Sequence, residues 1–534
     1  MPYQSGTVKM RDFHLPGRSP VFAQNGLCAT SHPLAAKVAL NILESGGNAM
    51  DAAIAGAVLL GICEPQMTGI GGDCFVLFSP PGTEKIKAMN GSGKAPIGLS
   101  AQIIRDKGHN VIPTQSVDAV TVPGAIDAFC QLSNDWGTLG LDTILAPAIK
   151  YAREGVPVAP KVAYDWSNAV HRLHDSATSK FSQTGRAPKV GDIFVAPGQA
   201  EVLENIALNG REGFYGGKVA EDMVTSLRAL GGTHTLKDFG DQRAFYTDPI
   251  AGHYKGMELV EHPPNGQGAT AILLLNILAQ FNIAALDPFG TQRAHIEAEA
   301  TKLAYDARNR IIADPNNTTA LEEMLSIDTA KRLAVQIDLS KVMAINPGLS
   351  EAAHKDTIYI TVVDKDRMVV SLIYSIFDSF GSGIASNRYG VLFQNRGAGF
   401  NLTQGHANEL HGGKRPMHTI IPAILRHNNR VVMPFGVMGG QYQSTGHSRI
   451  VSNMLDFSLS PQEAIDAPRC FLEAGTLKIE RGYKPEIVQE LADLGHSVNQ
   501  NVPAIGGSQA IFMHESGVLE GASDPRKDGC AIGY

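Results

Sequence analysis

The sequence predicts an α+β fold in which helices enclose β-sheets. Helical spacing of apolar residues dominates 34–62 and much of 125–350, whereas strand-like runs follow one another from residue 357 onward. The two kinds of segment do not alternate strictly, as they would in a nucleotide-binding βαβ fold. With 534 residues, the chain is long enough for several domains or for one large architecture of this kind.

Two helices are expected near the start of the chain. Residues 34–45 carry apolar side chains at helical spacing and stop at Gly46 and Gly47, where glycine commonly ends a helix. Residues 49–62 are almost all small or apolar, so this second helix is expected to be buried between layers. The run 67–78 (MTGIGGDCFVLF) then predicts a glycine-rich turn that leads into an apolar strand.

The middle of the chain, from about 125 to 350, reads mainly as helices joined by polar loops. In the helix predicted over 291–308, four polar residues recur at helical spacing. They are expected on a solvent-exposed face: His295, Glu299, Lys302 and Asp306.

The pattern changes abruptly at residue 357. A polar, loop-like segment over 345–356 is followed by two strands, 357–364 and 368–375, joined by a tight turn. Further strands are predicted at 390–395, 419–426 and 431–437, and a helix over 485–494 comes near the end.

Composition and the early sequence exclude several function classes. The formal net charge is −7 with no dense basic block, whereas nucleic-acid binding needs clustered Lys and Arg. The N-terminus lacks the apolar core of a signal peptide, and the apolar stretch 52–62 is only about half as long as a membrane span. We therefore expect a soluble, cytoplasmic protein with no membrane or nucleic-acid partner.

No metal or organic cofactor is predicted. The glycines of 69–73 (GIGGD) precede a strand, whereas a dinucleotide fingerprint follows a strand and opens a helix. His295 and Glu299 stand four apart, but no third ligand follows at a plausible spacing, and such a pair usually belongs to a solvated face. The six scattered cysteines form no CxxC pair, so neither a zinc knuckle nor a redox dithiol is indicated.

The junction between loop and strand at Asp356 and Thr357 allows chemistry of another kind. An N-terminal threonine supplies a hydroxyl nucleophile and, in its own α-amino group, the base that accepts the proton. Such a residue must be released by cutting the chain, which needs a flexible leader and a rigid strand behind the nucleophile. Both are predicted here, although a loop, an Asp, a Thr and a strand by themselves are a common pattern.

Twelve blocks, in this order, resemble the γ-glutamyltransferase family of N-terminal nucleophile hydrolases. In the first part of the chain they are SHPLAA (31–36), GGNAMDAAIA (46–55), EPQMTGIGGDCF (64–75), VPGAIDAF (122–129), PPNGQG (263–268) and KLAYDARNR (302–310). The rest are DTIYITVVDKD (356–366), FGSGI (380–384), GKRPMHTIIPAI (413–424), MGGQ (438–441), AIDAPR (464–469) and GASDPR (521–526).

The resemblance implies a four-layer αββα sandwich that matures by self-cleavage before Thr357. The products would be a large fragment, 1–356, and a small fragment, 357–534, which stay together as one unit and pair further into homo-oligomers. By position, Gly439 and Gly440 match the family's oxyanion-hole glycines, whose N–H groups stabilise the tetrahedral intermediate. Ser375 matches the hydroxyl residue that hydrogen-bonds the nucleophile. The alternatives are a simple turn for the glycines and an ordinary strand-end hydroxyl for Ser375.

The sequence departs from the family where a γ-glutamyl group would be recognised. The positions that match the family's α-carboxylate contacts are Ser92, His418 and Thr419, where an arginine and two serines are usual. The positions that match its α-amino contacts, usually Asn, Glu or Gln, and Asp, are Phe377, Arg396 and Gly399. An arginine repels an ammonium group but pairs with a carboxylate.

We therefore expect hydrolysis of an amide whose acyl group carries a distal carboxylate and no α-amino group, as in the branch that contains glutaryl-cephalosporin acylases. A true γ-glutamyltransferase or glutathione hydrolase is one alternative. An inactive, uncleaved relative is another. A further alternative concerns Arg396 alone, whose side chain would point away into a salt bridge with a neighbouring acid. Transfer of the acyl group to an acceptor amine instead of water also stays open.

Overall fold

The computed structural model describes residues 17–344 and 357–534, and its centre is a pair of seven-stranded antiparallel sheets. The first sheet has the order β1 (Val21–Ala23), β18 (Leu519–Ser523), β17 (Gly507–Met513), β13 (Arg430–Met438), β12 (Ala423–His427), β9 (Met257–Glu261) and β8 (Ile250–Tyr254). The second has the order β19 (Cys530–Gly533), β2 (Leu27–Thr30), β10 (Ile358–Val363), β11 (Val369–Ser375), β3 (Asp73–Ser79), β4 (Lys87–Gly91) and β7 (Phe245–Thr247).

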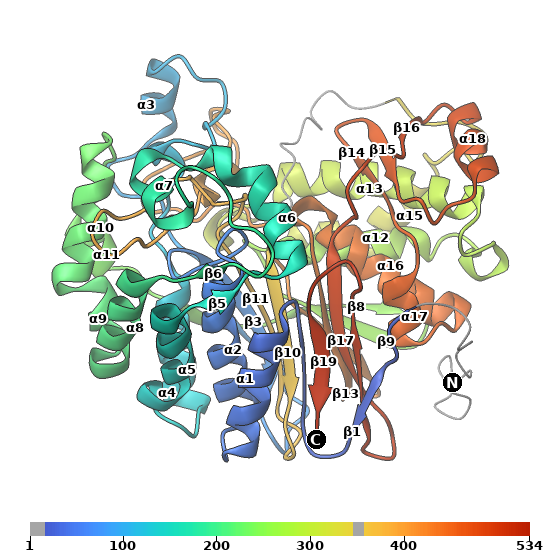
Figure 1. Cartoon of the computed structure of the whole chain (residues 1–534). Coiled ribbons are helices and arrows are strands. Elements are labelled where there is room, and N and C mark those ends of the chain that lie inside the picture. Colours follow the sequence, from blue (N-terminus) through green and yellow to red (C-terminus); the bar gives the residue numbers. More distant parts are fainter. Residues whose placement is uncertain (1–16, 345–356) are drawn as a thin grey trace.

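Helices lie on both sides of the paired sheets (Figure 1). On the side of the second sheet they include α1 (Pro33–Glu44), α2 (Ala49–Cys63), α4 (Ala125–Trp136), α5 (Leu141–Glu154) and α8 (Pro197–Asn209). On the side of the first sheet they include α12 (Gly268–Leu278), α13 (Thr291–Ile311) and α16 (Gln443–Phe457). Apolar side chains of both sheets, such as Leu77, Val363 and Ile424, fill the space between them. The predicted four-layer αββα sandwich is confirmed.

Smaller elements surround this sandwich. Beside the second sheet are α3 (Ala101–Asp106), β5 (Val156–Pro157), α6 (Pro160–Ala169), α7 (Asp175–Phe181), β6 (Ile193–Phe194), α9 (Glu212–Tyr215), α10 (Gly217–Ala229) and α11 (Leu236–Gly240). Beside the first are α14 (Leu321–Leu325), α15 (Ile327–Ala334), α17 (Pro461–Asp466), β14 (Cys470–Glu473), β15 (Thr476–Ile479), α18 (Pro485–Asp493) and β16 (Ser497–Asn499).

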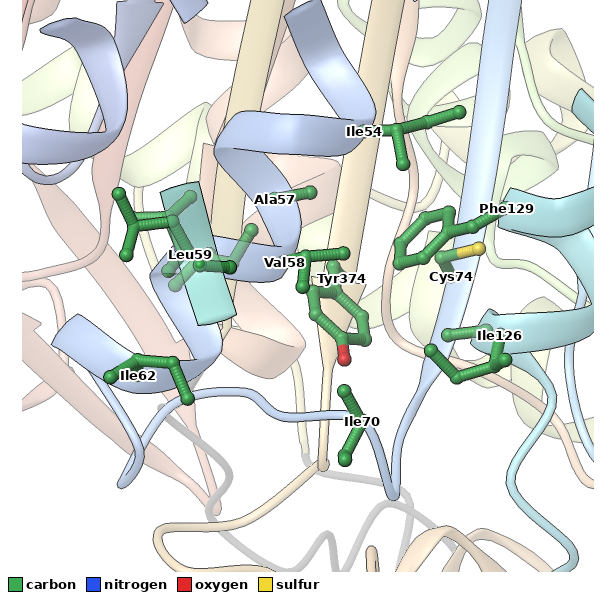
Figure 2. Close-up of a cluster of buried hydrophobic side chains, with 14 of the residues drawn as sticks. Ile54, Ala57, Val58, Leu59, Ile62, Ile70, Cys74, Ile126, Phe129 and Tyr374 are labelled. Atoms are coloured by element: carbon green, nitrogen blue, oxygen red, sulfur yellow. The ribbon is translucent and has the colours of Figure 1, made fainter. Parts of the chain in front are cut away.

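Helix α2 shows how residue size sets the layers. All fifteen of its residues are buried, because small side chains let it lie between the second sheet and the outer helices. Figure 2 shows Ile54 and Val58 of this helix facing Cys74, Phe129 and Tyr374, which come from β3, α4 and β11. The rings of the last two meet edge to face at 5.3 Å. The small-residue helix predicted over 49–62 is thus confirmed as a buried layer.

The two sheets are in close contact where Tyr359 of β10 faces Gly436 of β13. A Cβ on Gly436 would lie 2.3 Å from the Tyr359 ring, which is fully buried. We expect Gly436→Ala to lower the free energy of unfolding by about 1–3 kcal/mol, because the ring must move to admit a methyl group. Denaturant unfolding measures this. Gly240→Ala, in a helix with open space around it, is the matched control and should change little; equal effects would contradict the packing argument.

Three predictions about elements need correction. Besides β3, which matches the strand predicted within 67–78, the strands β2, β4, β7, β8 and β9 also precede residue 357; they have only three to five residues each and carry weak patterns. The segment 390–395, predicted as a strand, is a loop. One isolated antiparallel bridge, between Ala385 and Leu392, connects it to the preceding chain. The polar face predicted over 291–308 is not exposed: His295 and Glu299 are fully buried under β16 and the chain near residue 340.

Candidate active site

Thr357 lies directly before β10, next to the end of β11. The hairpin pairs Ile358 with Tyr374, and this register brings Thr357 opposite Ser375. Thr357 Oγ1 donates to Ser375 Oγ at 3.3 Å, and both residues are buried. Ser375 Oγ also accepts the N–H of Phe377 at 2.8 Å. Asp356, the other half of the expected cleavage site, lies outside the described residues.

Gly439 and Gly440 form a sharp turn between β13 and α16. Their φ angles of +127° and +58° lie in the region that favours glycine, and a Cβ on Gly439 would approach Gly506 Cα to 2.9 Å. Neither N–H group hydrogen-bonds within the described part of the chain. Two unpaired donors at the start of a helix form a site that can stabilise negative charge.

Arg396 forms a third part of the candidate site. It begins the short helical turn η6 (Arg396–Gly399), which ends at Gly399, and its side chain is completely buried. Its guanidinium stacks 4.2 Å above the ring of Phe377, and its Nη1 donates to Thr419 Oγ1 at 3.1 Å. Its Nε and Nη2 atoms have no hydrogen-bond partner, and it forms no ion pair with the described residues. Among the described residues, no salt bridge turns Arg396 away from the site.

Asp73 is the acid that balances part of this charge. Its Oδ1 accepts the N–H groups of Gly93 and Gly124 and the side chain of Gln394, while its Oδ2 lies 3.4 Å from His418 Nε2. Burial raises the pKa of Asp73 to about 6, against the pull of the Arg396 charge. Burial likewise lowers the pKa of Arg396 to about 9, with Asp73 acting in the opposite direction.

His418 and Ser92 complete the set of predicted binding residues. Burial, and then the Arg396 charge, hold the pKa of His418 well below its usual range, so this ring is neutral at neutral pH. Ser92 Oγ donates to Asn90 Oδ1 at 2.6 Å and accepts a hydrogen bond from Asn265 Nδ2 at 3.3 Å. The backbone carbonyl of Asn265 in turn accepts the backbone N–H of His418 at 2.7 Å. The structure therefore brings the predicted substrate-binding residues into one buried cluster.

Two residues that sequence reasoning did not assign connect the halves of this cluster. Gln267 Nε2 donates to the carbonyl oxygens of Thr419, at 2.6 Å, and Gly440, at 3.3 Å. Arg308 Nη1 donates to Gln267 Oε1 at 2.7 Å and to Gln441 Oε1 at 2.6 Å. Gln267 lies in the block PPNGQG and Arg308 in the block KLAYDARNR, so the family resemblance could have pointed to both residues. They fix the position of the glycine turn relative to Arg396.

Comparison with known proteins agrees with this geometry. The family model described as gamma-glutamyltranspeptidase matches residues 35–534. The chain belongs to the gamma-glutamyltranspeptidase family. It is 34% identical to the glutathione hydrolase-like YwrD proenzyme of Bacillus subtilis, with 96% of this chain and 99% of that protein covered. It is 33% identical to the oxamate amidohydrolase proenzyme of Klebsiella pneumoniae, with 96% and 98% covered.

Among solved structures, the cephalosporin acylase of Bacillus halodurans is similar with a TM-score of 0.91 and 36% identity, and 99% of each chain is covered. These matches support an amidohydrolase of the gamma-glutamyltranspeptidase family. Among the residues that the structure describes, no helix has the length and apolar character needed to cross a membrane.

The expectation that no third metal ligand stands near His295 and Glu299 also needs correction. His496, two hundred residues from His295 in sequence, places its Nε2 2.8 Å from His295 Nδ1, so a third ligand does stand near His295 and Glu299. Each of these groups already has protein partners, however. Glu299 pairs with Lys302 at 2.6 Å and accepts the Met343 N–H at 2.7 Å. His295 Nε2 contacts the carbonyl oxygen of Asp338 at 2.8 Å.

Glu64, at the end of α2, makes the stability of this protein depend on pH. It is buried and accepts the Ser31 hydroxyl at 2.6 Å, and burial raises its pKa to about 7, with Lys527 acting in the opposite direction. The unfolded chain releases this proton near pH ~4.5. Between these values the folded state binds more protons than the unfolded state, so stability falls as pH rises.

Glu64→Gln, which cannot ionise, should lack this contribution. We expect the variant to be more stable than wild type at pH 8 by about 1–3 kcal/mol and nearly equal to it at pH 4.5. Urea unfolding of both proteins at the two pH values measures the difference, and the other titrating groups cancel in the comparison. A difference that is the same at both pH values would contradict the assignment.

Proposed function

We propose that the protein is a self-cleaving amidohydrolase whose nucleophile is Thr357 and whose substrate carries a carboxylate at the far end of its acyl group. Self-cleavage before Thr357 would give fragments of 356 and 178 residues (534 − 356 = 178). Strands β10 and β11 of the small fragment pair with β2 and β3 of the large one. The fragments would therefore remain one αββα unit after the cut.

In the proposed cycle, Thr357 Oγ attacks the amide carbon while the free α-amino group accepts the hydroxyl proton. The N–H groups of Gly439 and Gly440 stabilise the oxyanion, a contribution of about 3–4 kcal/mol for one such donor in a serine protease. The C–N bond breaks, and the proton passes from the α-amine to the leaving amine. Water then attacks the acyl-threonine ester, releases the acid and restores the hydroxyl.

One observation carries the proposal for the acyl group. The unpartnered Nε and Nη2 atoms of Arg396 lie on the same edge of the guanidinium, the edge that forms two parallel hydrogen bonds to a carboxylate. This edge is buried beside Phe377, whose N–H binds Ser375, the neighbour of the nucleophile. A buried cation with two free donors is costly unless an anion binds there. A substrate carboxylate supplies that anion.

The relatives support the same class of reaction. Two of them are proenzymes by name, one an amidohydrolase that acts on oxamate, and the similar solved structure is an acylase. Oxamate itself is an amide with a carboxylate and no α-amino group. These names support the proposal of a carboxy-acyl amide as substrate, with an acyl chain long enough to span Thr357 and Arg396.

The alternative is a true γ-glutamyl enzyme, and matched substrates separate the two. We expect glutaryl-p-nitroanilide to be hydrolysed at least about ten-fold more efficiently than γ-glutamyl-p-nitroanilide, because the α-ammonium of the latter would meet the Arg396 charge. Release of p-nitroaniline reports kcat/KM for both. A preference for the γ-glutamyl compound would overturn the proposed acyl group and leave the nucleophile intact.

A further inference from the structure

A cavity of about 450 Å³ opens beside the glycine turn of the candidate active site. Gly439 and Gly506 lie in its wall, and so does Ser379, four residues after Ser375. Helix α6 and the β14–β15 hairpin contribute other parts of the lining, and Figure 1 shows both elements above the same end of the two sheets. The cavity thus adjoins the turn that would hold the oxyanion and the chain that follows the nucleophile's partner.

The cationic side chains of this cavity are not all in ion pairs with the described residues. Four cationic side chains line it, and three of them have a carboxylate partner: Lys161 pairs with Asp165, Lys478 with Glu473, and Arg172 with Asp378. The fourth is Lys527, which is only 8% exposed. Its ammonium group makes no hydrogen bond or ion pair with any residue that the structure describes. The carboxyl of buried Glu64 interacts electrostatically with it, but the Glu64 pKa of about 7 means that this acid offsets the Lys527 charge only in part at neutral pH.

The position of Lys527 is fixed by its neighbours. Its methylene chain packs against Gly507, where a Cβ would lie 2.8 Å from Lys527 Cε. Its carbonyl oxygen accepts a hydrogen bond from Arg18 at 2.9 Å, and the next residue, Asp528, accepts the N–H groups of Lys161 and Val162 at the start of α6. A nearly buried ammonium group held in place without an acceptor is preorganised to bind an anion.

We propose that this cavity receives the amine half of the substrate and that Lys527 binds a carboxylate on it. The inference rests on the proposed function, in which the acyl half extends toward Arg396 and the amine half must leave on another side of the glycine turn. Tyr442 and Phe471, with ring centroids 5.4 Å apart, provide an apolar wall for the rest of the amine. The leaving amine would therefore carry a carboxylate that reaches Lys527.

Glutaryl-glycine and glutaryl-glycinamide test this proposal, because they differ only in the charge of the leaving group. We expect kcat/KM of the mature wild-type protein to be at least about ten-fold higher for glutaryl-glycine, mainly through KM. In Lys527→Met the ratio should fall to about one. Lys527→Arg, which keeps the charge, and Lys85→Met, which removes an exposed charge elsewhere, should both keep the wild-type ratio.

A binding measurement separates this inference from the proposed function. Calorimetry with N-acetylglycine and N-acetylglycinamide needs neither hydrolysis nor the Arg396 pocket, and the same preference and its loss in Lys527→Met are expected. A ratio near one in wild type, or an unchanged ratio in Lys527→Met, overturns the role of Lys527. Absence of glutaryl hydrolysis together with preserved selective binding of N-acetylglycine overturns the proposed acyl group but supports the carboxylate site.

Discussion

Thr357→Ala protein is expected to remain a single full-length chain, whereas wild type separates into fragments of 356 and 178 residues on denaturing electrophoresis. The reason is that the hydroxyl of Thr357, hydrogen-bonded to Ser375, is the proposed nucleophile for self-cleavage as well as for amide hydrolysis. N-terminal sequencing of the small fragment should read TIYIT. Loss of amide hydrolysis should be at least about 10⁴-fold, the scale for removal of a catalytic nucleophile.

Two further variants sharpen this result. Thr357→Ser keeps a hydroxyl and an N-terminal amine and should still cleave, more slowly. Thr361→Val removes a buried hydroxyl from the same strand, where it donates to the Val370 carbonyl, and should cleave as wild type does. Wild type that stays intact after long incubation would favour the uncleaved, inactive alternative and would remove the basis of the proposed mechanism.

Arg396→Met is expected to change activity and stability in opposite directions. Loss of a buried, bidentate partner should lower kcat/KM for glutaryl-p-nitroanilide by about 30- to 1,000-fold, equivalent to about 2–4 kcal/mol. The same change removes a fully buried guanidinium that has two unpartnered nitrogen atoms in the absence of substrate. The melting temperature should therefore stay level or rise.

The opposite signs distinguish substrate binding from a structural role. If Arg396 only stabilised the fold through Phe377 and Thr419, the variant would lose stability and activity together. Arg388→Met is the matched control, because Arg388 is an exposed arginine whose only ion pair is with Glu201 on the surface in the part of the chain described. It should leave both measurements unchanged. A stable Arg396→Met protein with full activity on the glutaryl anilide would contradict the proposed acyl group.

Local patterns predicted the parts of the fold that depend on local physics. The helix over 34–45 and the buried helix over 49–62 appear as α1 and α2, since apolar spacing and small side chains are properties of the segments themselves. The hairpin after residue 357 appears as β10 and β11 for the same reason. Short strands such as β7 were missed, because three residues carry too little pattern and owe their conformation to pairing with β4.

The candidate site divides in the same way. The sequence predicted that Thr357 begins a strand and that Ser375 ends its hairpin partner. By resemblance, it also predicted that an arginine and a phenylalanine stand where the family contacts an ammonium group. Only the tertiary structure decided where these groups point: that Arg396 is buried over Phe377 with one edge unpartnered, that His496 reaches His295, and that Lys527 lines the cavity beside Gly439.

The physical reason is the difference between local and long-range interactions. Helix spacing, glycine turns and hairpins are set by neighbours along the chain, so Thr357 at the head of β10 could be recognised from its own segment. Burial and electrostatic interactions are set by residues hundreds of positions apart, as with Asp73 and Arg396, whose shifted pKa values arise from packing that no local pattern encodes.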